Sequence, residues 1–231
     1  MAKFNRISHT LTRSELWLGW IWLLFELFLL PTLLVMANAW ANYPLGSSWI
    51  NFLYFCINFL VVLVIFRRLL GHSVIHLGNH LGSCLKAAFL GFCVYYVTTR
   101  AMNELISFLY PGFSNVNDSN VSSMIRLDYV PMVIGTVILV PITEEVLFRG
   151  LVFRSFYGMN RMLGYILATA IFCAVHIISY IGSADPLTLV LCFIQYIPAS
   201  VCLAWAYAES DNIFAPILIH MVVNLMGILA L

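Results

Sequence analysis

The stretch Pro141-Ile-Thr-Glu-Glu-Val-Leu-Phe-Arg-Gly150 decides how this chain can fold. The segment 129–140 before it is almost entirely apolar, so Glu144 and Glu145 stand at the end of a hydrophobic run. Ionisable groups in such a run are costly and usually functional. In a helix, Glu145 and Arg149 stand at positions i and i+4 and can pair. Glu144 is rotated by about 100° from its neighbour, which leaves one acid free for chemistry.

The composition indicates a membrane protein. Of the 231 residues, 62% are hydrophobic and 9% are charged, and the mean hydropathy is +0.96. Soluble domains carry about 25% charged residues. The formal net charge is +1 and no basic run is present, so we expect a lipid bilayer and no nucleic acid as partners. The six cysteines form no C-x-x-C pair, and we interpret them as reduced thiols.

Seven apolar segments approach the roughly 20 residues that cross a bilayer. They are Leu16–Ala39, Ser48–Phe66, Cys84–Leu109, Val130–Leu151, Leu163–Ile181, Leu187–Ala208 and Ile213–Leu231. Pro31 predicts a kink in the first of them. The sequence therefore predicts an all-α, polytopic membrane helix bundle of about seven transmembrane helices in a single membrane domain. Within it, residues 1–128 have no assigned role and residues 129–231 carry the functional motifs.

The basic residues predict the orientation of the bundle, because positive charge collects on the cytoplasmic side. One side receives Lys3, Arg6, Arg13, Arg67, Arg68, Lys86, Arg154 and Arg161, while the other receives Arg126 and Arg100. We therefore expect a cytoplasmic N-terminus, an uncleaved first anchor and a polar outer loop at 111–128. The short chain favours a bacterial plasma membrane.

Three motifs stand on three different expected spans. The fourth span carries Glu144-Glu145-x-x-x-Arg149. The fifth carries Phe172-x-x-x-His176, and the seventh carries His220-x-x-x-Asn224. Each i,i+4 pair shares one helix face. Together they would gather a carboxylate, two imidazoles and an amide inside the bundle. A poorly solvated carboxylate is a competent base, and the other groups can hold water, bind a metal or stabilise an oxyanion.

This set of motifs, in this order, resembles the CPBP family, also called the CAAX protease and bacteriocin-processing or Abi family. The resemblance rests on the motifs at 141–150, 172–176 and 215–224, and it covers residues 129–231. It implies an intramembrane endopeptidase with a buried, water-filled cavity. Its substrates would be peptides or membrane proteins, such as prenylated C-terminal peptides, pheromones or bacteriocin precursors.

By the same resemblance, Glu144 would activate the water. His176, His220 and Asn224 would position the water and stabilise the oxyanion, or coordinate a metal. Glu145, Arg149 and Phe172 would be supporting residues. The cofactor would be either none or a single Zn²⁺, in which case His176 and His220 would be ligands.

Other interpretations of these residues, and of the function of the chain, are also compatible with the sequence. Glu144 and Glu145 could form a purely structural ion network with Arg149 and Arg154, and Cys173 could act as a nucleophile beside His176. The whole chain could be a non-catalytic membrane protein that binds a peptide or confers immunity. It could also be a proton-coupled transporter, although no repeat supports that.

Some residues have no place in the motifs. His72, His76 and His80 recur at i, i+4 and i+8, which is typical of the polar face of an interfacial helix and allows a surface metal site. Glu26 has no evident partner. Counting about 1.5 Å per residue, Glu144 lies roughly 15 Å from its cytoplasmic flank and His176 roughly 22 Å. Either helix tilt or a later start of the span would close this gap, and we expect the cavity to open on the cytoplasmic side.

Overall fold

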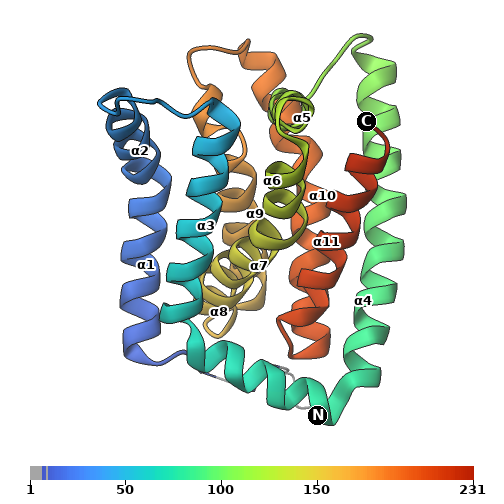
Figure 1. Ribbon diagram of the computed structural model, residues 1–231. Helices are drawn as coiled ribbons and strands as arrows, with labels where there is room; N and C mark the ends of the chain where they lie inside the picture. Colours follow the sequence, from blue (N-terminus) through green and yellow to red (C-terminus); the bar gives the residue numbers. More distant parts are fainter. Residues whose placement is uncertain (1–6, 9) are drawn as a thin grey trace.

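The computed structural model describes residues 7–8 and 10–231, and this part of the chain is helical without strands (Figure 1). Lys3 and Arg6 lie outside the described residues. The elements are α1 (Arg13–Phe28), α2 (Leu30–Ala39), α3 (Ser47–Ile65), α4 (Arg67–Leu109), α5 (Val116–Leu127), α6 (Tyr129–Ile134), η1 (Gly135–Leu139), α7 (Val140–Glu145), η2 (Val146–Phe153), α8 (Arg154–Tyr157), α9 (Arg161–Val175), η3 (Ile178–Tyr180), α10 (Pro186–Ser210) and α11 (Phe214–Leu229). The predicted all-α membrane bundle is confirmed.

Within residues 7–8 and 10–231, five helices are long and apolar enough to cross a membrane, and a bent pair counted as one span makes up to six. The five are Ser47–Ile65, Arg67–Leu109, Tyr129–Tyr157, Arg161–Tyr180 and Pro186–Ser210. The bent pair is α1 with α2, which meet at 47° where Pro31 opens α2, so the predicted kink is confirmed. The seventh expected span corresponds to α11, an apolar helix of 16 residues.

Capping side chains fix where the first helix begins. Thr12 accepts the backbone N–H of Glu15 at 3.2 Å, and the Glu15 carboxylate accepts the backbone N–H of Thr12 at 2.9 Å. This reciprocal capping box satisfies two backbone donors at the helix start. The same carboxylate accepts the backbone N–H of Leu69 at 2.9 Å. Glu15 therefore ties the start of α1 to the start of α4.

The helix α4 changes direction at His80, whose backbone angles (φ −133°, ψ 30°) are not helical. Its first part crosses the end of the bundle at which α1 begins, and its second part stands upright beside α11 (Figure 1). His72 and His76, with rings 6.1 Å apart, lie on the crossing part. Asn212 anchors this part by donating to the Ser73 carbonyl at 2.8 Å. His72 and His76 are thus helical, as predicted, whereas His80 lies at the bend.

The expected polar outer loop at 111–128 is wrong in one respect, because α5 occupies most of it. Asn115 caps this helix by accepting the backbone N–H groups of Asn117 and Asp118 at 3.0 and 3.2 Å. The helix lies at the end of the bundle opposite the first part of α4 (Figure 1). From α5 the chain continues into a single helical span, Tyr129–Tyr157, which runs from α6 to α8. Within this span η1 and η2 are π-helical.

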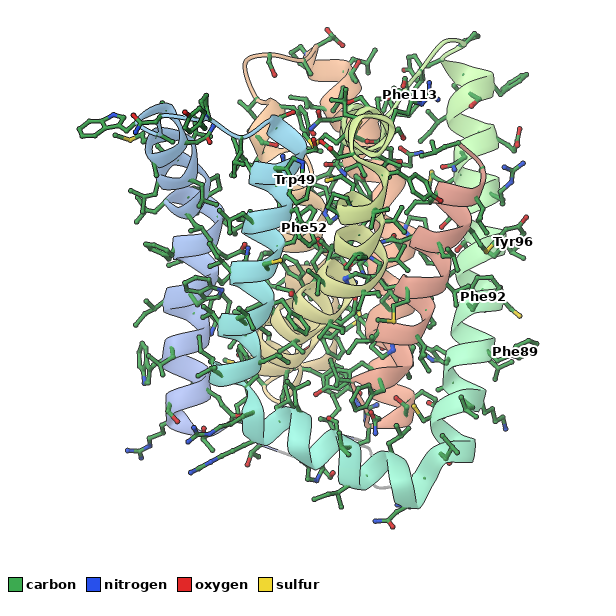
Figure 2. The ribbon with its side chains drawn as sticks, in the orientation of Figure 1. Trp49, Phe52, Phe89, Phe92, Tyr96 and Phe113 are labelled. Atoms are coloured by element: carbon green, nitrogen blue, oxygen red, sulfur yellow. The ribbon has the colours of Figure 1, made fainter. Side chains whose placement is uncertain are left out.

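Apolar side chains fill the core of the bundle and also make up much of its outer surface. The buried core centres on η2, where Val146, Leu151 and Phe153 are fully enclosed. On α4, Phe89 and Tyr96 point away from the bundle (Figure 2). Exposed apolar surface of this extent suits contact with lipid rather than water. The predicted membrane protein is consistent with this distribution.

Candidate active site

The two adjacent glutamates end α7, and the π-helical turn η2 begins directly after them. A π-helical turn adds one residue to the hydrogen-bonded ring and often marks a functional site. Every residue of η2 is buried, including Arg149. The sequence therefore brings a cation and two acids into the core of the membrane bundle, where each needs a partner.

Glu145 and Arg149 satisfy one another in the core. Arg149 Nη1 donates to Glu145 Oε1 at 3.1 Å, and both side chains are 0% exposed. Arg149 Nη2 also donates to the Ser200 carbonyl at 3.3 Å. The guanidinium lies over the Phe172 ring, 4.4 Å from its centroid. The predicted i,i+4 pair is confirmed, and it holds η2, α9 and α10 together.

His220 is held by Glu145 rather than by Glu144. Its Nδ1 lies 2.8 Å from Glu145 Oε1, the oxygen that also accepts from Arg149. A carboxylate oxygen accepts hydrogen bonds, so Nδ1 carries the donated proton. One helical turn further, Asn224 Nδ2 donates to the Thr136 carbonyl in η1 at 2.7 Å. Both motif residues of α11 are thus fixed against the α6–α8 span.

Glu144 faces His176. The distance from Glu144 Oε2 to His176 Nε2 is 4.0 Å, and the side chains are 25% and 14% exposed. This gap is too long for a direct hydrogen bond and short enough for one bridging water. Glu144 Oε2 has no hydrogen-bond partner among the residues that the structure describes. His176 Nδ1 lies 2.7 Å from the Phe172 carbonyl, to which it donates, so Nε2 is left facing the acid.

The difference in depth expected between Glu144 and His176 is absent. The helix α9 ends at Val175, and His176 occupies its C-cap. The side chain of His176 packs between two rings, Phe172 at 4.5 Å and Tyr196 at 4.3 Å between centroids. Helix packing therefore brings three spans to one level in the bundle, and all three motifs converge.

A cavity of about 750 Å³ contains this site. Its walls include Glu144, His176, His220 and Asn224, whereas Glu145 and Arg149 lie behind them. The cavity extends to α5, which lines it with the side chains of Asn117, Asp118, Asn120, Val121, Ser122, Met124 and Ile125. The cavity lining thus extends toward the end of the bundle opposite Arg154 and Asp211, the two residues that the sequence places at the cytoplasmic flanks.

Residues outside the three motifs also line the cavity. Glu26 of α1 is 5% exposed and accepts a hydrogen bond from the Tyr54 hydroxyl of α3, which supplies the partner that the sequence did not reveal. Asn58 of α3 accepts from Trp22 Nε1 at 3.1 Å. A glutamate inside an apolar span was the visible signal for this cluster. Nothing in the sequence indicated Tyr54 or Asn58.

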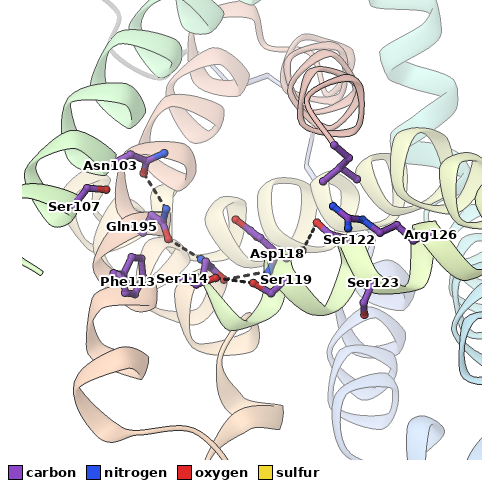
Figure 3. Close-up of a pocket in the computed structure, with 12 residues that line it drawn as sticks. Asn103, Ser107, Phe113, Ser114, Asp118, Ser119, Ser122, Ser123, Arg126 and Gln195 are labelled. Carbon is purple, nitrogen blue, oxygen red and sulfur yellow. Dashed lines mark hydrogen bonds between the residues drawn. The ribbon is translucent and has the colours of Figure 1, made fainter. Parts of the chain in front are cut away.

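A second, polar pocket of about 540 Å³ adjoins the cavity beside α5 (Figure 3). Asp118 and Ser122 line both spaces. A chain of side-chain amides crosses its wall: Gln195 Nε2 donates to Asn103 at 2.9 Å, and Asn115 Nδ2 donates to Gln195 at 2.7 Å. This chain joins α4, α10 and the start of α5.

The donor set does not fit a metal centre with three protein ligands. Within residues 7–8 and 10–231, no three His, Cys, Asp or Glu side chains are placed to hold a metal ion. His176 and His220 each use Nδ1 in a hydrogen bond within the protein, which leaves Nε2 as the ring nitrogen that each could offer to a metal. The six cysteines are free, as predicted. The chemistry is therefore derived from side chains and water.

Over residues 126–226 the chain matches the family described as Type II CAAX prenyl endopeptidase Rce1-like. The match spans all three motifs and is consistent with the CPBP family, so the resemblance drawn from the sequence is confirmed. At this level it supports a CAAX-type intramembrane endopeptidase. No curated protein and no solved structure matches the chain.

Proposed function

We propose, from that family match and the site geometry, that the chain is an intramembrane endopeptidase in which Glu144 activates a water molecule. The observation that carries the proposal is the 4.0 Å gap between Glu144 Oε2 and His176 Nε2 at the wall of the cavity. A water bound to both atoms would be held next to a substrate carbonyl. The substrates would be peptides or membrane-protein segments, because the cavity lies among apolar helices.

The reaction follows from these positions. Glu144 takes a proton from the water, and the resulting hydroxide attacks the carbonyl carbon of the scissile bond. Asn224 donates its second amide hydrogen to the oxyanion, and Nε2 of His220 does so when the imidazole carries protons on both nitrogens, because its Nδ1 proton is already donated to Glu145. The carbon–nitrogen bond then breaks, and Glu144 returns the proton to the leaving amine. General-base assistance of this kind contributes about 10²- to 10⁴-fold.

The buried pair behind the site supports this assignment of roles. Glu145 is fully enclosed and already accepts two hydrogen bonds at Oε1, so it orients His220 and does not meet substrate. Glu144 reaches the cavity with an unpaired oxygen. In this proposal Glu145 supports the structure of the site and Glu144 transfers the proton.

A membrane protein that binds peptides without cleaving them is the second candidate, because the same cavity would serve. Purified protein incubated with a quenched peptide library separates the two. Cleavage by the wild type, with peptide binding but no cleavage by Glu144→Gln, supports the protease. Glu104→Gln is the matched control, since Glu104 is exposed and pairs with Arg100 away from the cavity. Binding without cleavage by the wild type overturns the proposal.

A further inference from the structure

The imidazole of His176 lies where the backbone gives it little support. His176 is the C-cap of α9 and stands with Ile177 in a turn between α9 and the short 3-10 helix η3. Its orientation depends on the hydrogen bond to the Phe172 carbonyl and on the rings at its two sides. Rotation of the imidazole would break that bond and move Nε2 away from Glu144.

Tyr196 of α10 is the second of these rings. Its centroid lies 4.3 Å from that of His176, with 38° between the ring planes. The Tyr196 hydroxyl donates to Asp118 Oδ1 at 2.8 Å and accepts from Asn117 Nδ2 at 3.1 Å. Both partners belong to α5, so the ring is held from the α5 end of the cavity.

The first turn of α5 is itself fixed. Asn115 Oδ1 accepts the backbone N–H of Asp118 at 3.2 Å, and Asn115 Nδ2 donates to Gln195 of α10 (Figure 3). A carboxylate in the first turn of a helix is also favoured by the helix dipole. Burial raises the pKa of the Asp118 carboxyl, whereas the hydrogen bond from Tyr196 and the nearby charge of His176 oppose this rise. Asp118 also lines the cavity that contains Glu144 and His176.

We infer that Tyr196 is a positioning residue for His176, and that Asp118 holds Tyr196 in the orientation that this role requires. Asp118 and α5 thereby become parts of the active site, although they lie in the region 1–128 that carries no motif. The inference rests on the proposed function, since it concerns the water held between His176 and Glu144.

Three variants test the inference with a peptide that the wild type cleaves. Tyr196→Leu removes the ring and should lower kcat about 10- to 100-fold, because small misplacement of a catalytic group is costly. Tyr196→Phe and Asp118→Asn keep the shapes and should each lower kcat less, about 3- to 10-fold, with KM changed less than about 3-fold. The double variant Tyr196→Phe/Asp118→Asn should be no slower than the slower single variant, because both act on the same hydrogen bond, which Tyr196→Phe removes and Asp118→Asn weakens by taking away the charge of the acceptor.

Two controls separate positioning from general damage. Tyr165→Leu removes a half-buried ring that packs on Phe153, 5.0 Å away, and Asp185→Asn alters the carboxylate that caps α10. Both should keep kcat within about 2-fold, since neither residue touches the three motifs. Melting temperatures measured in detergent should not follow the order of the kcat losses.

Two results overturn the inference. One is a kcat for Tyr196→Phe and Asp118→Asn that equals the wild type, and the other is a pair of losses that multiply in the double variant. If Tyr196→Leu does not fold, these two variants still decide the question. Cleavage that persists in Glu144→Gln would instead refute the proposed function, so the two failures are distinguishable.

Discussion

At the scale of single residues, the adjacent glutamates differ because one α-helical position separates them. Glu145 points into the core and forms a charged cluster with Arg149 and His220, while Glu144 points into the cavity. Buried ion pairs contribute little net stability, but an isolated buried charge is very costly. The cluster therefore must stay intact for the catalytic side of the helix to keep its shape.

Breaking the buried pair from one side should destabilise the protein. Arg149→Met leaves the Glu145 charge in the core with only His220 beside it, and should lower the free energy of unfolding by about 3 kcal/mol or more. Unfolding of the detergent-solubilised protein by denaturant measures the change. The double variant Glu145→Gln/Arg149→Met should recover part of the loss.

The exposed pair Arg100–Glu104, with N–O distance 3.0 Å, provides the comparison. Arg100→Met should cost less than about 1 kcal/mol, because surface ion pairs are weak. Equal effects of Arg149→Met and Arg100→Met would contradict the role given to the buried cluster.

Cys173 should have no part in the chemistry. The thiol is fully buried, and Cys173 is not among the residues that line the cavity. Cys173→Ala should therefore keep most of the cleavage rate in a kinetic assay with a quenched peptide. Loss of cleavage with an unchanged melting temperature would contradict this prediction and support Cys173 as the nucleophile.

At the scale of elements, close contacts decide how α9 lies against the end of the preceding span. A Cβ added at Gly164 of α9 would stand 2.8 Å from Tyr157 Cα and 3.0 Å from its backbone nitrogen. Backbone atoms cannot move aside as a flexible side chain can. We therefore expect Gly164→Ala to displace α9 and lower the melting temperature by several degrees, as strained core substitutions do.

Gly78→Ala is the matched control for Gly164→Ala. Gly78 lies in the first part of α4, and a Cβ there meets no atom within 4 Å. Alanine favours helices by about 0.5–1 kcal/mol over glycine, so the melting temperature should stay the same or rise. A fall as large as that of Gly164→Ala would show that the close approach of α9 to Tyr157 is not what constrains the fold.

Particular residues show how far the sequence could predict the elements and the site. Apolar runs and i,i+4 spacing sufficed for most of the spans and for the Glu145–Arg149 pair, because these depend on local geometry, whereas the expected convergence of the motifs followed from their order and the family resemblance. The contacts of His220 with Glu145 and of Tyr196 with Asp118 join residues far apart in the chain. They depend on how helices pack, and no spacing encodes that. Only Asn115, a typical N-cap residue, hinted at α5.

At the scale of the whole molecule, the cavity lies toward the end of the bundle that carries α5, while Arg13, Arg67 and Arg161 begin helices toward the other end (Figure 1). The positive-inside rule places those basic residues in the cytoplasm. If this orientation holds, the cavity faces the outer side of the membrane. The orientation itself stays a prediction from the charges.

Labelling of single cysteines tests this orientation. In a variant without the six native cysteines, Ser123→Cys on α5 should react with a membrane-impermeant maleimide in intact cells. Gly158→Cys, between α8 and α9, should react only after lysis. Both positions are exposed, so accessibility to the reagent reports the side of the membrane. The reverse pattern would place the cavity on the cytoplasmic side.

The central claim is that Glu144 activates the attacking water, and the most direct measurement is the cleavage rate of one identified peptide by the wild type and by Glu144→Gln. Both are assayed with and without a metal chelator. We predict that the wild type cleaves at the same rate in either buffer and that Glu144→Gln is at least about 100-fold slower, the usual size of general-base assistance. A Glu144→Gln rate near that of the wild type would contradict the account. So would cleavage that the chelator abolishes and Zn²⁺ restores.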